Sequence, residues 1–282
     1  MTLLIDGPQS LAQSASAPPS RSSTPEHILT VAIGFQLALA FPSIFAFLLD
    51  ERLLNDISVW VKPLKFQASL VVMLATLLLL LPRIDATARH GRGILAAALT
   101  AAVTSTGEIV YITFQAARGR ASHFNFETDA ERLAYNLMGF GAAFLVLSSL
   151  VIGLYILLRP APGTGTGLRL GGGWGLILGS VLTLVTAFTL GSGQIDGPGH
   201  WVGGVRSDAG GLFLFGWSRT GGDLRVPHFF ATHIMQALPI LGLILDRTAP
   251  AMARPGIVAG AIASVVVVAL TFFQAIDGQP FL

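Results

Sequence analysis

The stretch LAYNLMGFGAAFLVLSSLVIGLYILL, residues 133–158, decides the fold class of this chain, because it contains no charged residue. A helix needs about 20 consecutive apolar residues to cross the hydrocarbon core of a bilayer. The whole chain has a matching composition, since 52% of its 282 residues are hydrophobic and 11% are charged. An ordinary soluble domain has roughly 25% charged residues. A soluble fold of this length would lack the polar residues to cover its surface, so the sequence predicts an all-α polytopic membrane protein.

Hydropathy along the chain predicts a bundle of seven transmembrane helices that forms one domain over residues 28–282. The expected spans are Ile28–Leu49, Leu64–Leu81, Ile94–Ala117, Leu133–Leu158, Trp174–Ser192, Pro227–Leu245 and Gly256–Ile276. Pro42 and Pro239 lie inside spans, where a proline removes a backbone donor and kinks the helix. Small residues recur at every fourth position and predict close packing of helix backbones. They are Gly171, Gly175 and Gly179, and then Gly256, Gly260 and Ser264.

Composition also excludes several kinds of site and partner. The chain has no cysteine, which excludes disulfides, thiolate metal sites, iron–sulfur clusters and cysteine nucleophiles. Its formal net charge of +2 is too small and too dispersed to indicate a nucleic-acid partner. Residues 1–27 are rich in Ser, Pro, Ala and Gln and predict a disordered tail. They lack the basic segment and apolar core of a cleavable signal peptide, and the expected partner is the lipid bilayer.

The loop charges indicate which end of the bundle faces the cytoplasm. Loops 83–93 and 159–173 contain Arg83, Arg89, Arg92, Arg159 and Arg169 against one acid, Asp85. The two sides have almost equal numbers of lysine and arginine residues. In every loop of the opposite side, however, acidic residues match the basic ones. Short loops with unneutralised arginines are typical of the cytoplasmic side. We therefore expect a cytoplasmic N-terminus and, after seven spans, a C-terminus on the other side.

This topology places three polar stretches at one end of the bundle, which we call the site face. They are Trp60–Phe66, Arg118–Asn125 and Gly221–Pro239. The opposite end has little besides arginines, glycines and threonines. The long glycine-rich connection Gly191–Gly222 also lies at the site face, and a connection of this length is typical of a lid or a binding loop. We therefore expect a polar pocket at this face, which is extracytoplasmic in the expected orientation.

Glu108 is the most costly residue of the chain to place in a membrane. A carboxylate inside a span costs roughly 2.5–3.5 kcal/mol on insertion scales and is by default a functional candidate. Thr104, Tyr111 and Gln115 lie at positions −4, +3 and +7 from Glu108. Helical periodicity places all four on one narrow stripe. The glutamate either belongs to a functional site or is a hydrogen-bonded residue that only locks the bundle together.

His233 and Gln236 form a second polar pair, three residues apart in the sixth span. Counted from the site face, Glu108 lies about 13 Å deep, and His233 and Tyr111 lie about 9 Å deep. We therefore expect His233 to meet Glu108 and Tyr111. His228 lies some 140° around the helix from His233, so it either bends inward in the first turn or serves another partner.

Basic residues at the site face predict a mouth that attracts anions. Lys62 and Lys65 begin the second span, where they either snorkel to lipid headgroups or hold an anionic group. The candidates for binding a ligand are Lys62, Lys65, Gln115, Arg118, Arg120, Asn125, Trp217, Asp223 and Arg225.

Three sequence blocks resemble those of a family of uncharacterised bacterial multi-pass membrane proteins with seven spans. The blocks are Trp60–Phe66, Glu108–Gly119 with Ser122–Asn125, and Gly222–His228 with His233 and Gln236. The resemblance implies a location in the bacterial inner membrane and brings no activity with it. A retinal protein is excluded, because the last span has no lysine for a Schiff base. Zinc-dependent membrane hydrolases also fit poorly, because the histidines of the sixth span are five residues apart.

Three hypotheses of function follow, and the first is a redox or metal protein. His233, with His123 or His228, would bind a haem b iron, or His233, Glu108 and His228 would hold a single metal ion. Gln236 and Tyr111 would orient these ligands.

The second hypothesis is a carrier or receptor for a small anionic or protonatable solute. Glu108 would carry the coupled proton and the basic residues would attract the ligand. The third is a structural or assembly protein whose polar residues only fix helix packing.

Overall fold

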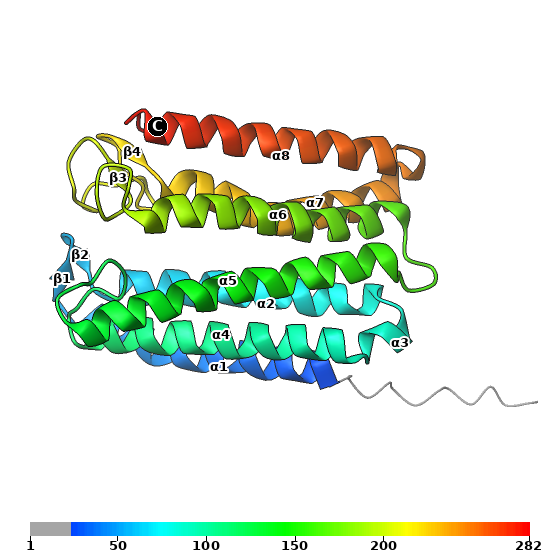
Figure 1. Cartoon of the computed structure of the whole chain (residues 1–282), viewed down its shortest axis with the longest axis horizontal. Helices are drawn as coiled ribbons and strands as arrows, with labels where there is room; N and C mark the ends of the chain where they lie inside the picture. Colours follow the sequence, from blue (N-terminus) through cyan, green and yellow to red (C-terminus); the bar gives the residue numbers. More distant parts are fainter. Residues whose placement is uncertain (1–23) are drawn as a thin grey trace, which may run out of the picture.

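The structure is a computed structural model that describes residues 24–282 as a bundle of long helices lying side by side (Figure 1). The long helices are α1 (Thr24–Leu49), α2 (Val61–Leu80), α4 (Arg92–Ala117), α5 (Asp129–Leu158), α6 (Thr166–Ser192), α7 (Arg225–Thr248) and α8 (Ala253–Ile276). Within the described residues, seven helical segments are long and apolar enough to cross a membrane. The protein is an all-α polytopic membrane protein with a seven-helix bundle, as the sequence predicts.

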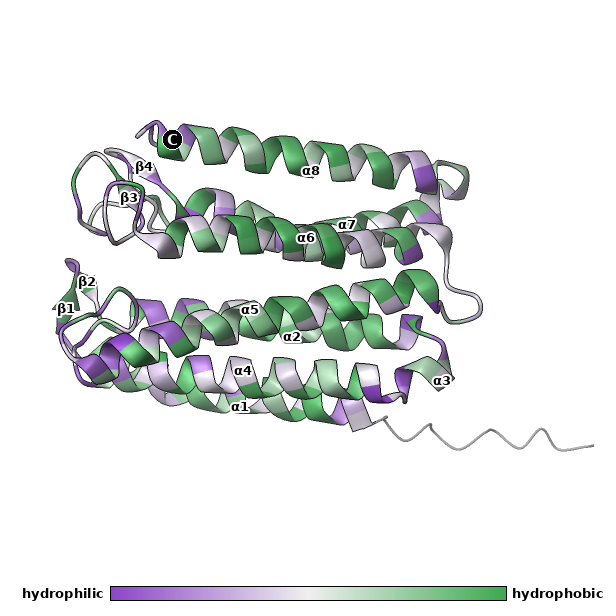
Figure 2. Ribbon diagram, in the orientation of Figure 1, coloured by the Kyte–Doolittle hydropathy of each residue, from purple (hydrophilic) through white to green (hydrophobic). Residues whose placement is uncertain are grey.

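Short elements lie at the two ends of the bundle. The site face has two small antiparallel strand pairs, formed by β1 (Leu53–Leu54) with β2 (Ile57–Ser58) and by β3 (Trp201–Val202) with β4 (Gly222–Asp223). The opposite end has η1 (Leu81–Arg83), α3 (Ala86–Arg89) and η2 (Pro250–Met252). Figure 2 shows hydrophobic residues along the middle of the helices and hydrophilic residues gathered towards the ends, as expected for a bundle that crosses a bilayer.

All seven long helices begin before the expected starts of their spans, and the start of α6 differs most. Helix α1 begins at Thr24, so residues 24–27 of the expected tail are helical, and the remainder of that tail lies outside the described residues. Helix α6 begins at Thr166, well before the expected start at Trp174. The backbone N–H groups of Gly167 and Leu168 donate to the Asp246 carboxylate of α7 at 2.7 Å each. A carboxylate that accepts these otherwise unpaired donors stabilises the first turn of a helix.

The bundle consists of two helix groups. Helices α1, α2, α4 and α5 pack together as the first group, and α6, α7 and α8 form the second (Figure 1). Helices α5 and α6 join the groups, and the Ser180 hydroxyl of α6 donates to the carbonyl of Val146 in α5 at 3.0 Å. The fully buried core includes large side chains from both groups, among them Leu29, Leu74, Leu77, Ile94, Ile152 and Leu176.

The four-residue glycine repeats pack helices closely, as predicted. A Cβ atom on Gly171 would overlap the Leu238 carbonyl of α7, and one on Gly175 would lie 2.8 Å from the Cδ of Pro239. Gly256 and Gly260 of α8 likewise lie against leucines of α7. Close backbone contact of this kind stabilises helix packing through dispersion forces. Apolar side chains gain little by leaving lipid for a helix interface.

Candidate functional site

The connection between α6 and α7, residues 193–224, covers the site face, and we call it the loop cap. The Ser207 hydroxyl donates to the Asp56 carboxylate at 2.6 Å, and the backbone N–H of Asp208 donates to the carbonyl of Asn55 at 3.1 Å. Asn55 and Asp56 form the turn between β1 and β2. The loop cap, which belongs to the second helix group, is therefore fastened to the first.

Arg225, at the start of α7, is the centre of the loop cap's ionic contacts. Its guanidinium donates to Asp223 at 2.7 Å and to the carbonyl of Gly216 at 2.7 Å, and it pairs with Asp208 at 2.9 Å. Asp208 also accepts from His200 Nε2 at 3.2 Å. These contacts occupy the donors of Arg225, which we had expected to bind a ligand together with Asp223, and they show both residues holding the loop cap together.

Two titratable groups of this network have shifted pKa values. Burial lowers the pKa of His200, because the imidazolium form loses hydration. Burial opposes the charged form of Asp208 as well, but the hydrogen bond from His200 and the charge of Arg225 outweigh it and lower its pKa. Neutral His200 and ionised Asp208 are therefore the favoured forms in the folded protein.

The connection between α4 and α5 is held by four side chains, those of Arg118, Arg120, Gln115 and Glu131. The Arg120 guanidinium donates to Glu131 Oε2 at 2.7 Å, and Gln115 Nε2 donates to Glu131 Oε1 at 3.2 Å. Arg118 donates to Gln115 Oε1 at 3.0 Å. The Glu131 carboxylate raises the pKa of Arg120 by accepting its hydrogen bonds.

Asn125 also serves this connection, because its amide donates to the carbonyl of Ala121 at 2.9 Å. Four of the expected ligand-binding side chains here, Gln115, Arg118, Arg120 and Asn125, thus contact the protein itself. Sequence reasoning missed Glu131, whose place in an acidic run is typical of an exposed helix start.

The two lysines of α2 have different surroundings. Lys65 Nζ donates to the carbonyl of Phe215 in the loop cap at 2.8 Å. The ammonium of Lys62 is desolvated and interacts electrostatically with Asp208, Arg225 and Glu108. Within residues 24–282, no hydrogen bond or ion pair engages it, and its Nζ lies 5.8 Å from the centre of the Phe66 ring. Lys62 therefore carries a partly buried charge without a direct counter-ion.

Glu108 and His123 lie near Lys62. Glu108 is buried and faces α5, where a Cβ atom on Gly141 would lie 3.1 Å from Oε1. In the part of the chain that the structure describes, its carboxylate has no hydrogen-bond partner. His123 lies between the rings of Phe66 and Tyr135, and its Nδ1 is 3.1 Å from the Ser122 hydroxyl.

Burial, reinforced by the charge of Lys62, lowers the pKa of His123 well below its usual range. The cluster of Lys62, Glu108 and His123 thus brings together a cation, a carboxyl group and a neutral imidazole. A cation that lacks a counter-ion beside a carboxyl group and a neutral imidazole is suited to binding an anion or a protonatable acid.

The histidines of α7 face different helices. His233 Nδ1 donates to the carbonyl of Phe229 at 2.8 Å, and the two rings are 4.0 Å apart. His228 Nδ1 lies 3.2 Å from the Thr186 hydroxyl of α6. Gln236 donates to Thr76 of α2 at 3.1 Å. His228 is therefore a partner of α6 and Gln236 a partner of α2, and His233 shares the side of α7 that carries Gln236.

The expected meeting of His233 with Glu108 and Tyr111 is not seen. The hydroxyl of Tyr111 accepts from Gln115 Nε2 at 3.1 Å instead, and no hydrogen bond or ion pair between described residues joins His233 to either group. Nowhere in residues 24–282 do three histidine, aspartate or glutamate side chains gather closely enough to hold a metal ion. The donor set of His233, Glu108 and His228 therefore lacks the geometry for a metal site.

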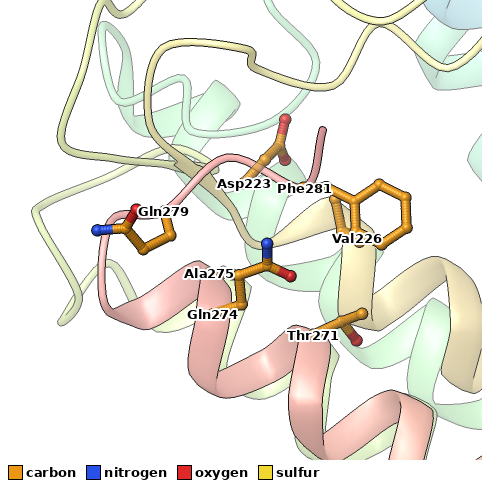
Figure 3. Close-up of a pocket in the computed structure, with 7 residues that line it drawn as sticks. All are labelled: Asp223, Val226, Thr271, Gln274, Ala275, Gln279 and Phe281. Atoms are coloured by element: carbon orange, nitrogen blue, oxygen red, sulfur yellow. The ribbon is translucent and has the colours of Figure 1, made fainter.

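Trp217 belongs to an aromatic cluster at the site-face end of α7. Its ring stacks on Phe215 at 4.4 Å and meets Phe229 and Phe281 edge-on at 5.3 and 5.4 Å. Beside this cluster is a small hollow lined by Asp223, Val226, Thr271, Gln274, Ala275, Gln279 and Phe281 (Figure 3). Lys62 and Glu108 are not among its lining residues.

Sequence reasoning missed the loop-cap residues that hold Arg225 and Lys65. Asp208, His200 and the Phe215 carbonyl act from an irregular segment, where neither helical nor strand periodicity is present to indicate which side chains point inward. No family model, curated protein or solved structure matches this chain.

Proposed function

We propose that the protein binds a small anionic or protonatable solute at Lys62, as a carrier or receptor in the bacterial inner membrane. The observation that carries this proposal is the Lys62 ammonium, which is partly buried and has no direct counter-ion. A desolvated charge inside a membrane protein is costly unless a partner compensates it. A bound anion supplies that partner.

The neighbouring residues define how the anion is held and released. Arg225 adds positive potential near Lys62, which Asp208 offsets, and the donors of Arg225 and Lys65 stay engaged by the loop cap. Glu108 lies on the inner side of the cluster and competes with the anion for Lys62 when it is ionised. Protonation of Glu108 therefore favours the bound state, and loss of its proton favours release.

The binding proposal is tested by the thermal stability of detergent-purified protein with acetate, succinate or inorganic phosphate. At least one of these anions is expected to raise the melting temperature of the wild type and of Lys62→Arg, and to leave Lys62→Met unchanged. Arg120→Met is the matched control, because its charge is already paired with Glu131. A wild-type protein that none of the three anions stabilises, or an equal response of Lys62→Met, contradicts the proposal.

The role of Glu108 is tested in proteoliposomes with the anion that stabilises the protein. Glu108→Gln keeps the shape of the side chain and cannot release a proton, so anion-dependent proton movement is expected to disappear. Unchanged proton movement in this variant rules out the role.

The proposed orientation has the N-terminus in the cytoplasm and the site face in the periplasm. The loops that carry unneutralised arginines support it. Because the chain has no cysteine, single substitutions report the side directly. An impermeant maleimide added to intact cells is expected to label Gln279→Cys and not Arg92→Cys, and the reverse pattern would mean the opposite orientation.

A further inference from the structure

Helices α2 and α7 turn polar faces towards each other across the boundary between the two helix groups. On α2, Lys62, Lys65, Ser69 and Thr76 recur at intervals that place them on one side of the helix. On α7, Phe229, His233 and Gln236 share a side in the same way. We call the junction of these two faces the α2–α7 seam.

Contacts join the faces of α2 and α7 at the two ends of the seam, and the middle of the seam is less closely packed. At the site face, Lys65 binds the carbonyl of Phe215, whose ring meets Phe229 edge-on at 5.1 Å. Deeper in the bundle, Gln236 donates to Thr76 at 3.1 Å. The two helix backbones otherwise make little direct contact.

Polar atoms remain unpaired between these two contacts. Ser69 is exposed on α2, and its hydroxyl has no hydrogen bond to any residue in the range 24–282. The Nδ1–H of His233 is taken by the carbonyl of Phe229, so its Nε2 is a free acceptor. Unpaired polar groups at membrane depth are costly, and a ligand with a polar head lowers that cost when it occupies the seam.

Apolar side chains continue the outer side of the seam towards the lipid. Val72 of α2 is 45% exposed, and Ile240 of α7 is 56% exposed. At the site-face end, the tip of the loop cap presents Phe213 and Leu214, which are 92% and 72% exposed. Leu214 has a φ of 70°, a backbone conformation that a branched side chain seldom adopts. The apolar tip of the loop cap therefore includes a strained backbone position.

We propose that the α2–α7 seam admits an anionic amphiphile from the bilayer, whose acidic head binds Lys62 while its acyl chain lies against Val72 and Ile240. This rests on the proposed anion site and specifies its substrate as a long-chain carboxylate taken from the membrane. Lys65 lies beside the path of the head, and Ser69 and His233 supply the polar contacts along it. The exposed tip of the loop cap contacts the chains of the surrounding lipid.

The test uses protein in phosphatidylcholine nanodiscs and three probes: oleate, oleyl alcohol and butyrate. Oleate has both charge and chain, oleyl alcohol has the chain alone, and butyrate has the charge with little chain. Binding is measured by native mass spectrometry. Oleate is expected to bind the wild type at least about tenfold more tightly than either other probe, which corresponds to about 1.4 kcal/mol.

A matched pair of variants tests the path. Ser69→Phe fills the seam, whereas Ala68→Phe places the same ring on the neighbouring exposed position, about 100° around α2. Oleate binding is expected to fall at least about tenfold in Ser69→Phe and to persist in Ala68→Phe. Equal oleate affinity in the two variants overturns the seam as the path.

The outcomes also separate this inference from the anion site itself. If butyrate binds as tightly as oleate and requires Lys62, the anion site stands and the amphiphile is wrong. If oleyl alcohol binds as tightly as oleate, the acidic head is not recognised and the inference fails. If neither oleate nor butyrate binds, the amphiphile inference fails, and the anion site is decided separately by the responses to acetate, succinate and inorganic phosphate.

Discussion

At the scale of single residues, Glu131 shows how a buried carboxylate is held at the membrane surface. It accepts from Arg120, Gln115 and Thr128, at 2.7, 3.2 and 2.9 Å, and so ties the start of α5 to the preceding loop. Charge-assisted hydrogen bonds of this kind are stronger than neutral ones. The acids in this run are therefore not equivalent, although they look alike in the sequence.

Glu131→Gln is expected to lower the apparent melting temperature in detergent by at least about 4 °C, because it removes the charge that Arg120 faces. Glu127→Gln is the control, since Glu127 pairs with the same arginine but its side chain is 71% exposed, and exposed ion pairs contribute little. Equal effects of the two substitutions would show that burial of Glu131 is unimportant.

The lowered pKa of His200 gives the loop cap a pH dependence. Because the folded-state pKa lies below the unfolded value of about 6.5, the stabilisation is present above pH 6.5 and is lost as the pH falls through the folded-state pKa. Hydrogen-exchange protection factors, which correct for the slower intrinsic exchange at low pH, are expected to fall in residues 196–224 between pH 7.5 and pH 5. His200→Phe keeps a ring on Trp201 and cannot bind a proton, so it should weaken this response. The lowered pKa of His123 acts in the same direction. A response of unchanged size in His200→Phe would assign the pH dependence to other groups.

At the scale of helices, close packing of α6 on α7 depends on glycine. Gly171→Ala is expected to destabilise the protein by about 2 kcal/mol, because the added methyl overlaps the Leu238 carbonyl, which cannot move without the helix. Gly139→Ala is the control, since a Cβ atom there meets nothing within 4 Å, and it should be neutral or slightly stabilising. Unfolding in sodium dodecyl sulfate measures both. Similar behaviour of the two variants would contradict the packing argument.

Hydropathy and small-residue spacing were sufficient to predict the helices and much of their packing. The spans were identified because each has to be apolar over its whole length, and Gly171 and Gly175 because close approach needs small side chains at every fourth position. The start of α6 was missed because its capping group, Asp246, is distant in the sequence and comes from another helix.

The candidate site was predicted less completely. The sequence indicates that Glu108 and Lys62 are unusual, because each is ionisable and lies in or beside a span. It does not indicate which cations are already paired. Arg120 and Arg225 resemble Lys62 in sequence, but Glu131, Asp208 and Asp223 engage them. Asp208 lies in an irregular segment, where no periodicity indicates the direction of its side chain.

At the scale of the whole molecule, the two helix groups are joined through α5 and α6. A Cβ atom on Gly153 of α5 would lie 2.9 Å from the carbonyl of Gly173 in α6, so the two backbones are in close contact. Fragments 1–163 and 164–282, expressed together, are expected to copurify when only one carries a tag. Gly153→Leu, which forces these helices apart, should reduce recovery of the untagged fragment. Fragments that purify separately would show that the covalent connection is required.

The order of the helices has a consequence for how the protein is made. A ribosome delivers α1 to α5 to the membrane before the loop cap and α7 have been synthesised. During that interval Lys65 lacks the Phe215 carbonyl, Thr76 lacks Gln236, and Lys62 lacks the charges of Asp208 and Arg225. The nascent first helix group therefore has an unsatisfied polar side within the membrane, and the second half of the chain completes it.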